Sequence, residues 1–493
     1  MAIKRYDATQ DNTITNAFKA DLRTKATGSN MGASDILETF VIHGQTSASI
    51  SAQNAEEARI LIQFDLNKIG SDRSAGTIPA SGSVNFYLKM FNAEHADTTP
   101  ENLTLDVKIL SASWDEGRGL DMENYTDIGK CNWVSASSTT AWATTGSDYH
   151  ALAAVNNFSG SVTFVKGNED LELEVTPAVE NWLAGTKTNY GFLLKQTQAA
   201  ITGSSGSLFT KMFHGRSTEF VMQKPVIEAR WDDSRKDQRG SFILSSSVLS
   251  SENNLNTLYL YNRFRGTLTD VLRLSENRLS VAFYTASSDG APIGVRAIVT
   301  DITGAATTAV EAGKLIENGN EITGIYTASF ATTSSFSELN DVWHSGSTEF
   351  FTGSFKPASY KLLLEDRTEP YMSKITNLSS LYSTDDKPVF RVFVRPKRWQ
   401  PTIYSVASVE IENTIIEDAY YKVFRIEDNL EVIPFGTGTT NHTRMSYDVS
   451  GNYFELDMEP FESGFNYGIQ FAYLLQGDYI EQPEVFKFRV EDP

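Results

Sequence analysis

Short runs of alternating apolar and polar residues, separated by clusters of Gly, Asn, Asp, Ser and Thr, dominate this sequence. Because side chains alternate between the two faces of a strand, this period of two predicts half-buried β-strands. Segments 177–183, where Pro177 follows Thr176, and 309–317 are weak helix candidates. The chain is therefore expected to be all-β, with strands at 58–66, 84–90, 103–110, 171–175, 281–284, 390–394, 420–426 and 485–490.

The chain has 493 residues, which is too long for a single hydrophobic core. Charged and polar breaks at 232–240 and 365–373 predict three domains, 1–232, 233–368 and 369–493. The size of the first suits a jelly-roll β-sandwich, and the other two suit immunoglobulin-like β-sandwiches. We therefore expect tandem β-sandwiches, without the Cys–Trp–Cys pattern of a true immunoglobulin domain.

Acidic residues outnumber basic ones by 62 to 42, which gives a net charge of −20. This charge repels phosphate backbones and anionic lipids, so dedicated nucleic-acid binding and membrane insertion are not expected. The single cysteine, Cys131, excludes an internal disulfide framework and a cysteine-rich zinc site. The first residues lack the apolar stretch of a signal peptide, so synthesis in the host cytoplasm is expected.

Segment 113–142 combines three tryptophans with many acidic residues. Carboxylate oxygens are ligands that Ca²⁺ prefers, and exposed indole rings stack on sugar rings, so one interpretation is a glycan or calcium loop. The alternative is a long loop between strands, pinned by buried rings and acidic turn residues. The spacing misses the EF-hand pattern, so no metal site is assigned. The candidate residues are Trp114, Asp115, Glu116, Asp121, Asp127, Trp133 and Trp142.

No nucleotide-binding loop, nucleophile elbow or helical zinc motif occurs in the sequence, so no enzymatic activity and no cofactor are expected. Adjacent carboxylates at 115/116 and 169/170 would point to opposite faces of a strand, which argues against a glycosidase pair. Segment 391–399 holds the main basic cluster and ends in an aromatic ring. It is a candidate subunit interface, or simply a solvated strand end. Its residues are Arg391, Arg395, Lys397, Arg398 and Trp399.

Three ordered motifs resemble the DNRLRE-type β-sandwich domain over roughly residues 30–200. They are ARILIQFDL at 58–66, SWDEG at 113–117 and TPAVENWL at 176–183. Ile62 stands where the family pattern has a leucine. The resemblance implies a β-sandwich whose motif positions are Arg59, Leu61, Phe64, Asp65, Trp114, Glu116, Val179 and Trp182.

The later part of the chain resembles virion structural proteins of large tailed bacteriophages, especially marine ones. The resemblance is carried by YYKVFRI at 420–426, MSYDVSGNYFELD at 445–457 and FKFRV at 486–490, and by WHSGSTEFFTGSF at 343–355. It implies a virion protein without enzymatic activity. We expect a symmetric, multi-copy assembly that contacts copies of itself and capsid, portal, neck or tail proteins. A carbohydrate-binding adhesion module on the virion or host surface is the alternative, and a polysaccharide hydrolase is a more distant one.

Overall fold

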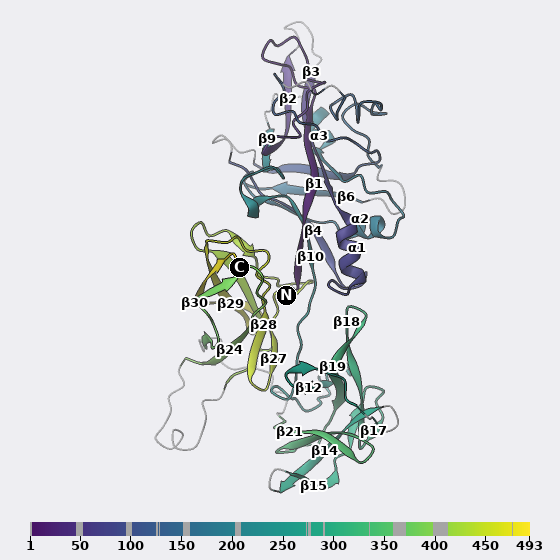
Figure 1. Cartoon of the computed structure of the whole chain (residues 1–493), viewed down its shortest axis with the longest axis vertical. Helices are drawn as coiled ribbons and strands as arrows, with labels where there is room; N and C mark the ends of the chain where they lie inside the picture. The colour runs from purple at the N-terminus through teal and green to yellow at the C-terminus, as the bar shows by residue number, and fades with distance from the viewer. Residues whose placement is uncertain are drawn as a thin grey trace. The chain divides into compact units, whose positions relative to one another are not determined.

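A computed structural model describes residues 2–45, 53–94, 101–124, 127, 129–150, 158–202, 209–272, 274, 278–288, 291–334, 336–357, 371–397, 413–475 and 477–493. Strands make up most of the regular structure, which confirms the all-β prediction. The chain divides into two compact units, a first unit of residues 3–231 and a second unit that holds residues 232–493 (Figure 1). The predicted boundary at 368/369 lies outside the described residues.

The described residues of the first unit form ten strands and three short α-helices. Its longest strand, β1, changes partners at an irregularity between Ala8 and Gln10, pairing first with β10 and then with β3. The elements are β1 (Ile3–Thr15), β2 (Ile36–Gln45), β3 (Gln53–Phe64), α1 (Leu66–Ser74), β4 (Asn85–Met90), β5 (Leu103–Ile109), β6 (Ser159–Phe164), β7 (Leu171–Glu174), α2 (Thr176–Leu183), β8 (Phe192–Gln196), α3 (Gln198–Thr202), β9 (Phe209–His214), the 3₁₀ turn η1 (Val221–Gln223) and β10 (Val226–Arg230).

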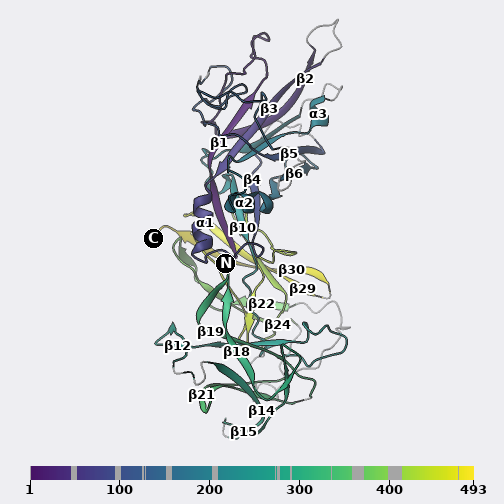
Figure 2. The ribbon, with the colours of Figure 1, turned by 90° about the vertical axis from the view of Figure 1, so that its right-hand side faces the viewer.

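The strands of the first unit include a closed circuit of paired neighbours. In the order β4–β10–β1–β3–β2–β9, each strand pairs with the next. The circuit closes because Asn92, just after β4, forms an isolated bridge with Phe213 of β9. Helices α1 and α2 lie side by side near β4 (Figure 2). The helix predicted at 177–183 is confirmed as α2, whereas α1 begins after Asp65, whose carboxylate accepts the Asn67 N–H.

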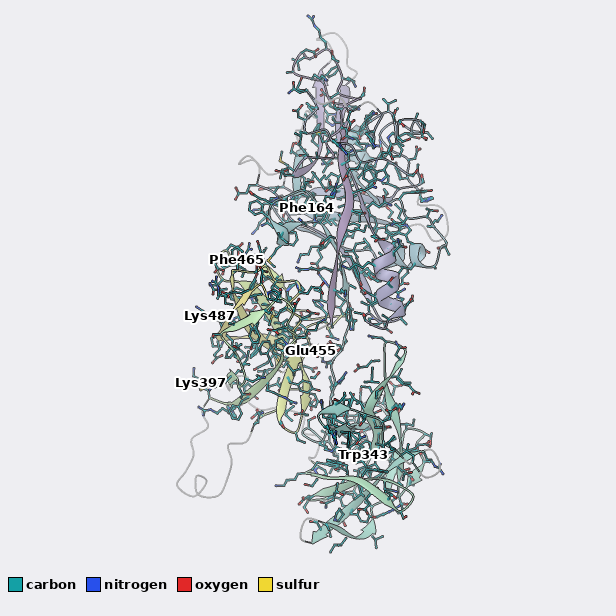
Figure 3. The ribbon with its side chains drawn as sticks, viewed as in Figure 1. Phe164, Trp343, Lys397, Glu455, Phe465 and Lys487 are labelled. Carbon is teal, nitrogen blue, oxygen red and sulfur yellow. The ribbon has the colours of Figure 1, made fainter. Side chains whose placement is uncertain are left out.

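The second unit begins with a sandwich of residues 242–357, here called the middle sandwich. Strand β18 pairs with both β14 and β19 and so joins the two sheets. The rings of Phe283 in β14 and Phe330 in β19 face each other in the core, with their centres 4.0 Å apart. Trp343 is fully buried in the same core (Figure 3). The strands are β11 (Asn256–Tyr261), β12 (Arg263–Phe264), β13 (Thr267–Leu268), β14 (Leu279–Ser288), β15 (Ala291–Arg296), β16 (Val299–Asp301), β17 (Ala306–Thr307), β18 (Val310–Glu317), β19 (Asn320–Ala331), β20 (Leu339–Ser345) and β21 (Thr348–Phe355).

The helix expected at 309–317 is wrong, because this segment forms β18. Val310 and Ala312 are buried while Glu311 and Gly313 are exposed, which is the alternation of a strand with one face in the core. Pairing with β14 and β19 supplies the backbone hydrogen-bond partners. Here tertiary pairing overrides a weak local helix preference.

The described residues within 371–493 form a second sandwich, here called the C-terminal sandwich, with a four-stranded and a five-stranded sheet. The rings of Tyr421 and Phe454, one from each sheet, stack at 4.2 Å and join the two layers. The strands are β22 (Tyr371–Ile375), β23 (Leu381–Ser383), β24 (Val389–Pro396), β25 (Ala419–Arg425), β26 (Glu431–Ile433), β27 (Ser446–Asp448), β28 (Gly451–Glu455), β29 (Asn466–Leu475) and β30 (Asp478–Glu491).

Candidate functional site

The three tryptophans of segment 113–142 are core residues of the first unit. Trp114, Trp133 and Trp142 are only 5%, 7% and 5% exposed. The indole N–H of Trp114 donates to the carbonyl of Tyr190, and that of Trp142 donates to the carbonyl of Asn132, both at 2.9 Å. The stacking surface expected for a sugar is therefore not offered by these rings, because their faces already contact protein.

The acidic side chains of the same segment mostly bind nearby backbone. Asp121 accepts the N–H groups of Glu123 and Asn124, and Asp127 accepts the N–H of Arg118. Asp115 lies 3.9 Å from the Lys130 ammonium, and both side chains are about half exposed. Within the described ranges, no three His, Cys, Asp or Glu side chains gather as metal ligands would. The residues proposed for calcium are thus brought into turns rather than around one point.

Glu116 takes part in an ion pair that joins distant parts of the first unit. Its carboxylate accepts two bonds from the Arg216 guanidinium, at 2.7 and 2.5 Å, and one from the Asp11 N–H at 2.8 Å. Asp11 is fully buried, and its carboxylate accepts the Arg216 N–H. Burial raises the pKa of Asp11 to about 6, the hydrogen bond from Arg216 lowers it, and the nearby Glu116 charge raises it further.

Asn30, which the sequence did not single out, lies at the centre of the WDEG segment. Its side-chain amide donates to the Cys131 carbonyl at 2.6 Å and accepts N–H bonds from Gly32 and Gly119. A Cβ added at Gly119 would lie 1.6 Å from the Asn30 carbonyl oxygen, so only glycine fits there. These contacts give the motif a structural role in fixing the loop.

The other motif positions of the DNRLRE resemblance are structural as well. The Arg59 guanidinium lies 4.7 Å from the Trp133 ring centre and donates to the Gly146 carbonyl. Asp65 caps α1, and Trp182 packs on Phe192 with ring centres 4.8 Å apart. Leu61, Phe64 and Val179 are fully buried or nearly so.

The basic cluster of the C-terminal sandwich is only partly described, because Arg398 and Trp399 lie outside the described residues. Arg391 donates to Asp448 at 2.6 Å and lies over the Tyr453 ring, so its charge is paired within the sandwich. Arg395 lies 3.6 Å from the sulfur of Met372. Lys397 is exposed near the end of β24 (Figure 3). An interface role for this cluster stays a prediction.

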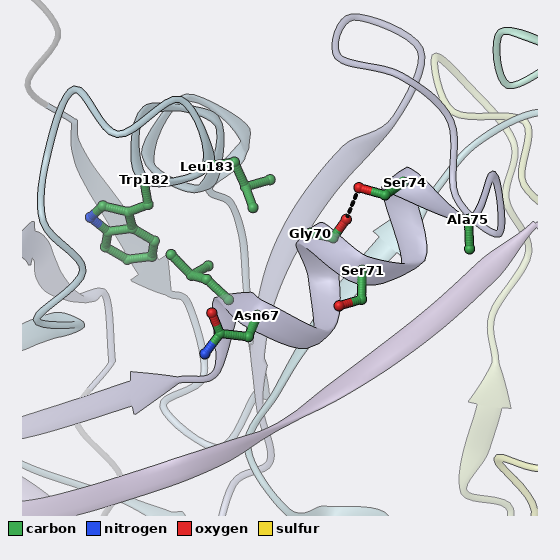
Figure 4. A pocket seen from close by; sticks show the side chains of 8 residues that line it. Asn67, Gly70, Ser71, Ser74, Ala75, Trp182 and Leu183 are labelled. Atoms are coloured by element: carbon green, nitrogen blue, oxygen red, sulfur yellow. Dashed lines mark hydrogen bonds between the residues drawn. The ribbon is translucent and has the colours of Figure 1, made fainter.

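A hollow of about 770 Å³ lies between α1 and α2 (Figure 4). Its lining residues include Asn67, Ser71, Ser74 and Leu183, and no side chain that titrates near neutral pH contributes to it. Ser74 donates its hydroxyl to the Gly70 carbonyl. The hollow therefore offers no acid, base or activated nucleophile for catalysis.

The middle sandwich ends in an unpartnered strand. Strand β21 pairs with β20 on one side, and no other described strand lies on its second side. Its first five residues are exposed, including Phe350 at 37% and Phe351 at 41%. Long edge strands with exposed aromatic residues are ready templates for pairing with another chain. This edge is therefore a candidate interface.

Comparisons with known proteins found weak structural likenesses. No family model and no curated protein matches the sequence. The chain is similar to a structure of tandem immunoglobulin repeats of Dlar, with 7% identity, 49% of this chain and 91% of that chain covered, and a TM-score of 0.14. It is also similar to a DUF4785 family protein from Legionella pneumophila, with 8% identity, coverage of 98% and 92%, and a TM-score of 0.14.

A third similar structure is a Salmonella alpha-2-macroglobulin, with 8% identity and a TM-score of 0.15. The match covers 92% of this chain and 26% of the macroglobulin. Likenesses this weak carry no argument about function. In the part of the chain that the structure describes, no helix is long and apolar enough to cross a membrane.

Proposed function

We propose that this chain is a non-enzymatic structural protein of a tailed-phage virion that assembles through lateral contacts with copies of itself. In this proposal a jelly-roll-like domain precedes two immunoglobulin-like ones, and capsid, portal, neck or tail proteins are further partners. The observation that carries the proposal is the open edge at β21. The resemblance of the middle and C-terminal segments to virion structural proteins supports the proposal that the chain belongs to a phage virion.

Strand β21 has little of the charge and proline that usually protect a sheet edge, although its pairing with β20 is irregular between Trp343 and His344. Its sequence TEFFTGSF contains one charged residue and no proline. By contrast, the edge strand β15 carries Pro292, and Gly294 with a φ of 95°, which discourage pairing. An edge as long and apolar as β21 is an aggregation hazard unless a specific partner covers it.

A second copy of the same strand fits this edge. In antiparallel self-pairing about a two-fold axis centred on Thr352, Phe351 lies opposite Gly353 and Glu349 lies opposite Phe355. The two carboxylates then do not face each other, and the Phe351 ring of each copy covers Gly353 of the partner strand. A two-fold interface of this kind uses the same patch on both copies.

Sedimentation velocity of the purified full chain tests the proposal. The wild type is expected to form dimers as its concentration rises, and Phe350→Lys is expected to remain monomeric because two lysines enter the paired edge. Val485→Lys is the matched control, since Val485 is also 37% exposed but lies in the C-terminal sandwich. This control should dimerise like the wild type.

Two results would overturn the proposal. A wild type that is monomeric at every concentration would remove the self-assembly, as would a Phe350→Lys variant that dimerises normally. Proteomics of purified phage particles tests the virion setting separately, because a structural subunit must be present there at many copies.

A further inference from the structure

A fully buried lysine lies in the first unit. The Lys211 side chain is 0% exposed, and its ammonium lies 4.5 Å from the Phe164 ring centre and 5.2 Å from that of Phe213. Phe164 is labelled in Figure 3. Lysine is almost never fully buried without a specific role or partner, so this environment needs an explanation.

The polar partners of Lys211 include a side-chain amide at very short range. Nζ lies 2.5 Å from Oδ1 of Asn92, 2.8 Å from the Gly167 carbonyl and 2.7 Å from the Glu169 carbonyl. The two carbonyls hold the nitrogen in place. The contact with Oδ1 brings it against the amide group of Asn92, whose carbon is an electrophile.

The pair lies at the seam that closes the strand circuit of the first unit. Asn92 bridges Phe213, the Ala93 N–H donates to the Met212 carbonyl, and the His214 N–H donates to the Phe91 carbonyl. Lys211 is in β9, and Asn92 follows β4, with 119 positions between them. Asp170 accepts the backbone N–H of Asn92 at 2.8 Å and so fixes that side of the seam.

Burial makes the amine of Lys211 a better nucleophile than an ordinary lysine. It lowers the pKa of Lys211 to about 8, although the charges of Glu169 and Asp170 act in the opposite direction. At pH 7 roughly a tenth of the amine is then neutral, far more than for an ordinary lysine, and only the neutral form carries the lone pair needed for attack.

We propose that Lys211 and Asn92 form an intramolecular amide cross-link. The Lys211 nitrogen attacks Cγ of Asn92, a new Nζ–Cγ bond forms, and the Cγ–Nδ2 bond breaks. One proton moves from the attacking amine to the departing nitrogen, and ammonia leaves. No oxidant or reductant takes part, so the step is complete with groups present in the chain.

The Glu169 carboxylate is assigned to carry this proton. Its Oε2 atom is buried and accepts no hydrogen bond from any described residue, while Oε1 accepts the Lys166 N–H at 2.7 Å. Burial raises the pKa of Glu169, but backbone hydrogen bonds led by that of Lys166 lower it overall, so the group is an ionised base. Its charge acts on the Lys211 amine, and an ionised carboxylate can accept the proton during attack and return it to the leaving group.

The cross-link would join β9 covalently to the extension of β4. Because these segments close the strand circuit, the bond would prevent the seam from opening under heat or force. A covalent link between residues this far apart also restricts the unfolded chain strongly. The proposed cross-link does not depend on whether the chain assembles through β21.

Mass spectrometry of the intact, denatured full chain tests the proposal. The wild type is expected to weigh less than its sequence mass by one ammonia molecule, with a branched tryptic peptide that joins Lys211 to Asn92. The isosteric variant Asn92→Asp should lose one water instead, because hydroxide replaces the amide nitrogen as the leaving group. Glu169→Gln should contain a smaller cross-linked fraction after the same time.

Lys195→Met is the matched control, because Lys195 is also buried in the first unit at 3% exposure. It should keep the loss of ammonia, whereas Lys211→Met should show the full sequence mass. A wild type with the full sequence mass and an unmodified Lys211 peptide would overturn the proposal. So would an ammonia loss that fragmentation places at any other residue.

Discussion

Replacing Asp341 by Asn removes one charge from a buried ion cluster of the middle sandwich without changing its shape. Asp341 is 0% exposed, and one of its oxygens accepts bonds from Arg239 at 2.7 Å and from the Trp343 indole at 2.8 Å. Arg239 also donates to Asp237 and to the Tyr259 carbonyl. The cluster therefore attaches the segment before the sandwich to β20 and β11.

The expected loss of stability arises because the buried Arg239 guanidinium loses one of its two negatively charged partners. Removing one partner of a buried pair typically destabilises a protein by about 3–5 kcal/mol. Arg239 keeps Asp237, so the lower end, about 3 kcal/mol, applies to Asp341→Asn. If local unfolding limits exchange, that value corresponds to roughly a 100-fold faster exchange of the protected amides.

Hydrogen exchange with mass spectrometry measures this effect locally, which matters in a chain of two compact units. Amides of β20 and its partner β14 should exchange faster in Asp341→Asn, while those of the first unit stay unchanged. Glu311→Gln, an exposed change in the same sandwich, is the control and should alter the free energy by less than about 0.5 kcal/mol. Equal exchange in wild type and Asp341→Asn would refute the reasoning.

Two further predictions concern the first unit. The folded pKa of Asp11, about 6, lies above its ordinary value of 3.8, so its contribution to stability is full below 3.8 and is lost as the pH rises through 6. The expected loss of unfolding free energy is about 3 kcal/mol at pH 7, and Asp11→Asn should remove most of it. Urea unfolding of the wild type and the variant at acid and neutral pH measures this. If Asp11 played no part, the unfolding free energy of both proteins would change with pH by the same amount. Gly119→Ala should destabilise the first unit by about 2 kcal/mol or more, because the added Cβ would overlap the Asn30 backbone. Gly28→Ala, which has open space around the added Cβ, should melt like the wild type, and equal melting of both variants would contradict the packing argument.

The strand pattern was readable from the sequence because alternation reports directly on which face is buried. Helix α1 was missed, although Asp65 followed by the segment that begins at Leu66 is an N-cap signal, because the preceding strand pattern was extended through Leu66. The weak helix expected at 309–317 contained Gly313 and an alternating start, both of which favour the observed strand.

The candidate site was harder to predict, because its contacts join residues far apart in the sequence. Glu116 meets Arg216 across 100 positions, and Asn30 meets Cys131 across 101. Local patterns cannot show whether a tryptophan in a loop turns inward, as Trp133 and Trp142 do. The same limit applies to Lys211 and Asn92, which show no sign of each other in the sequence.

Concentration-dependent hydrogen exchange at β21 tests the assembly proposal most directly. If copies of the chain pair through this edge, its outward-facing amides should become protected as the protein concentration rises, while those of the edge strand β15 stay unchanged. Identical exchange of β21 in dilute and concentrated samples would contradict the account.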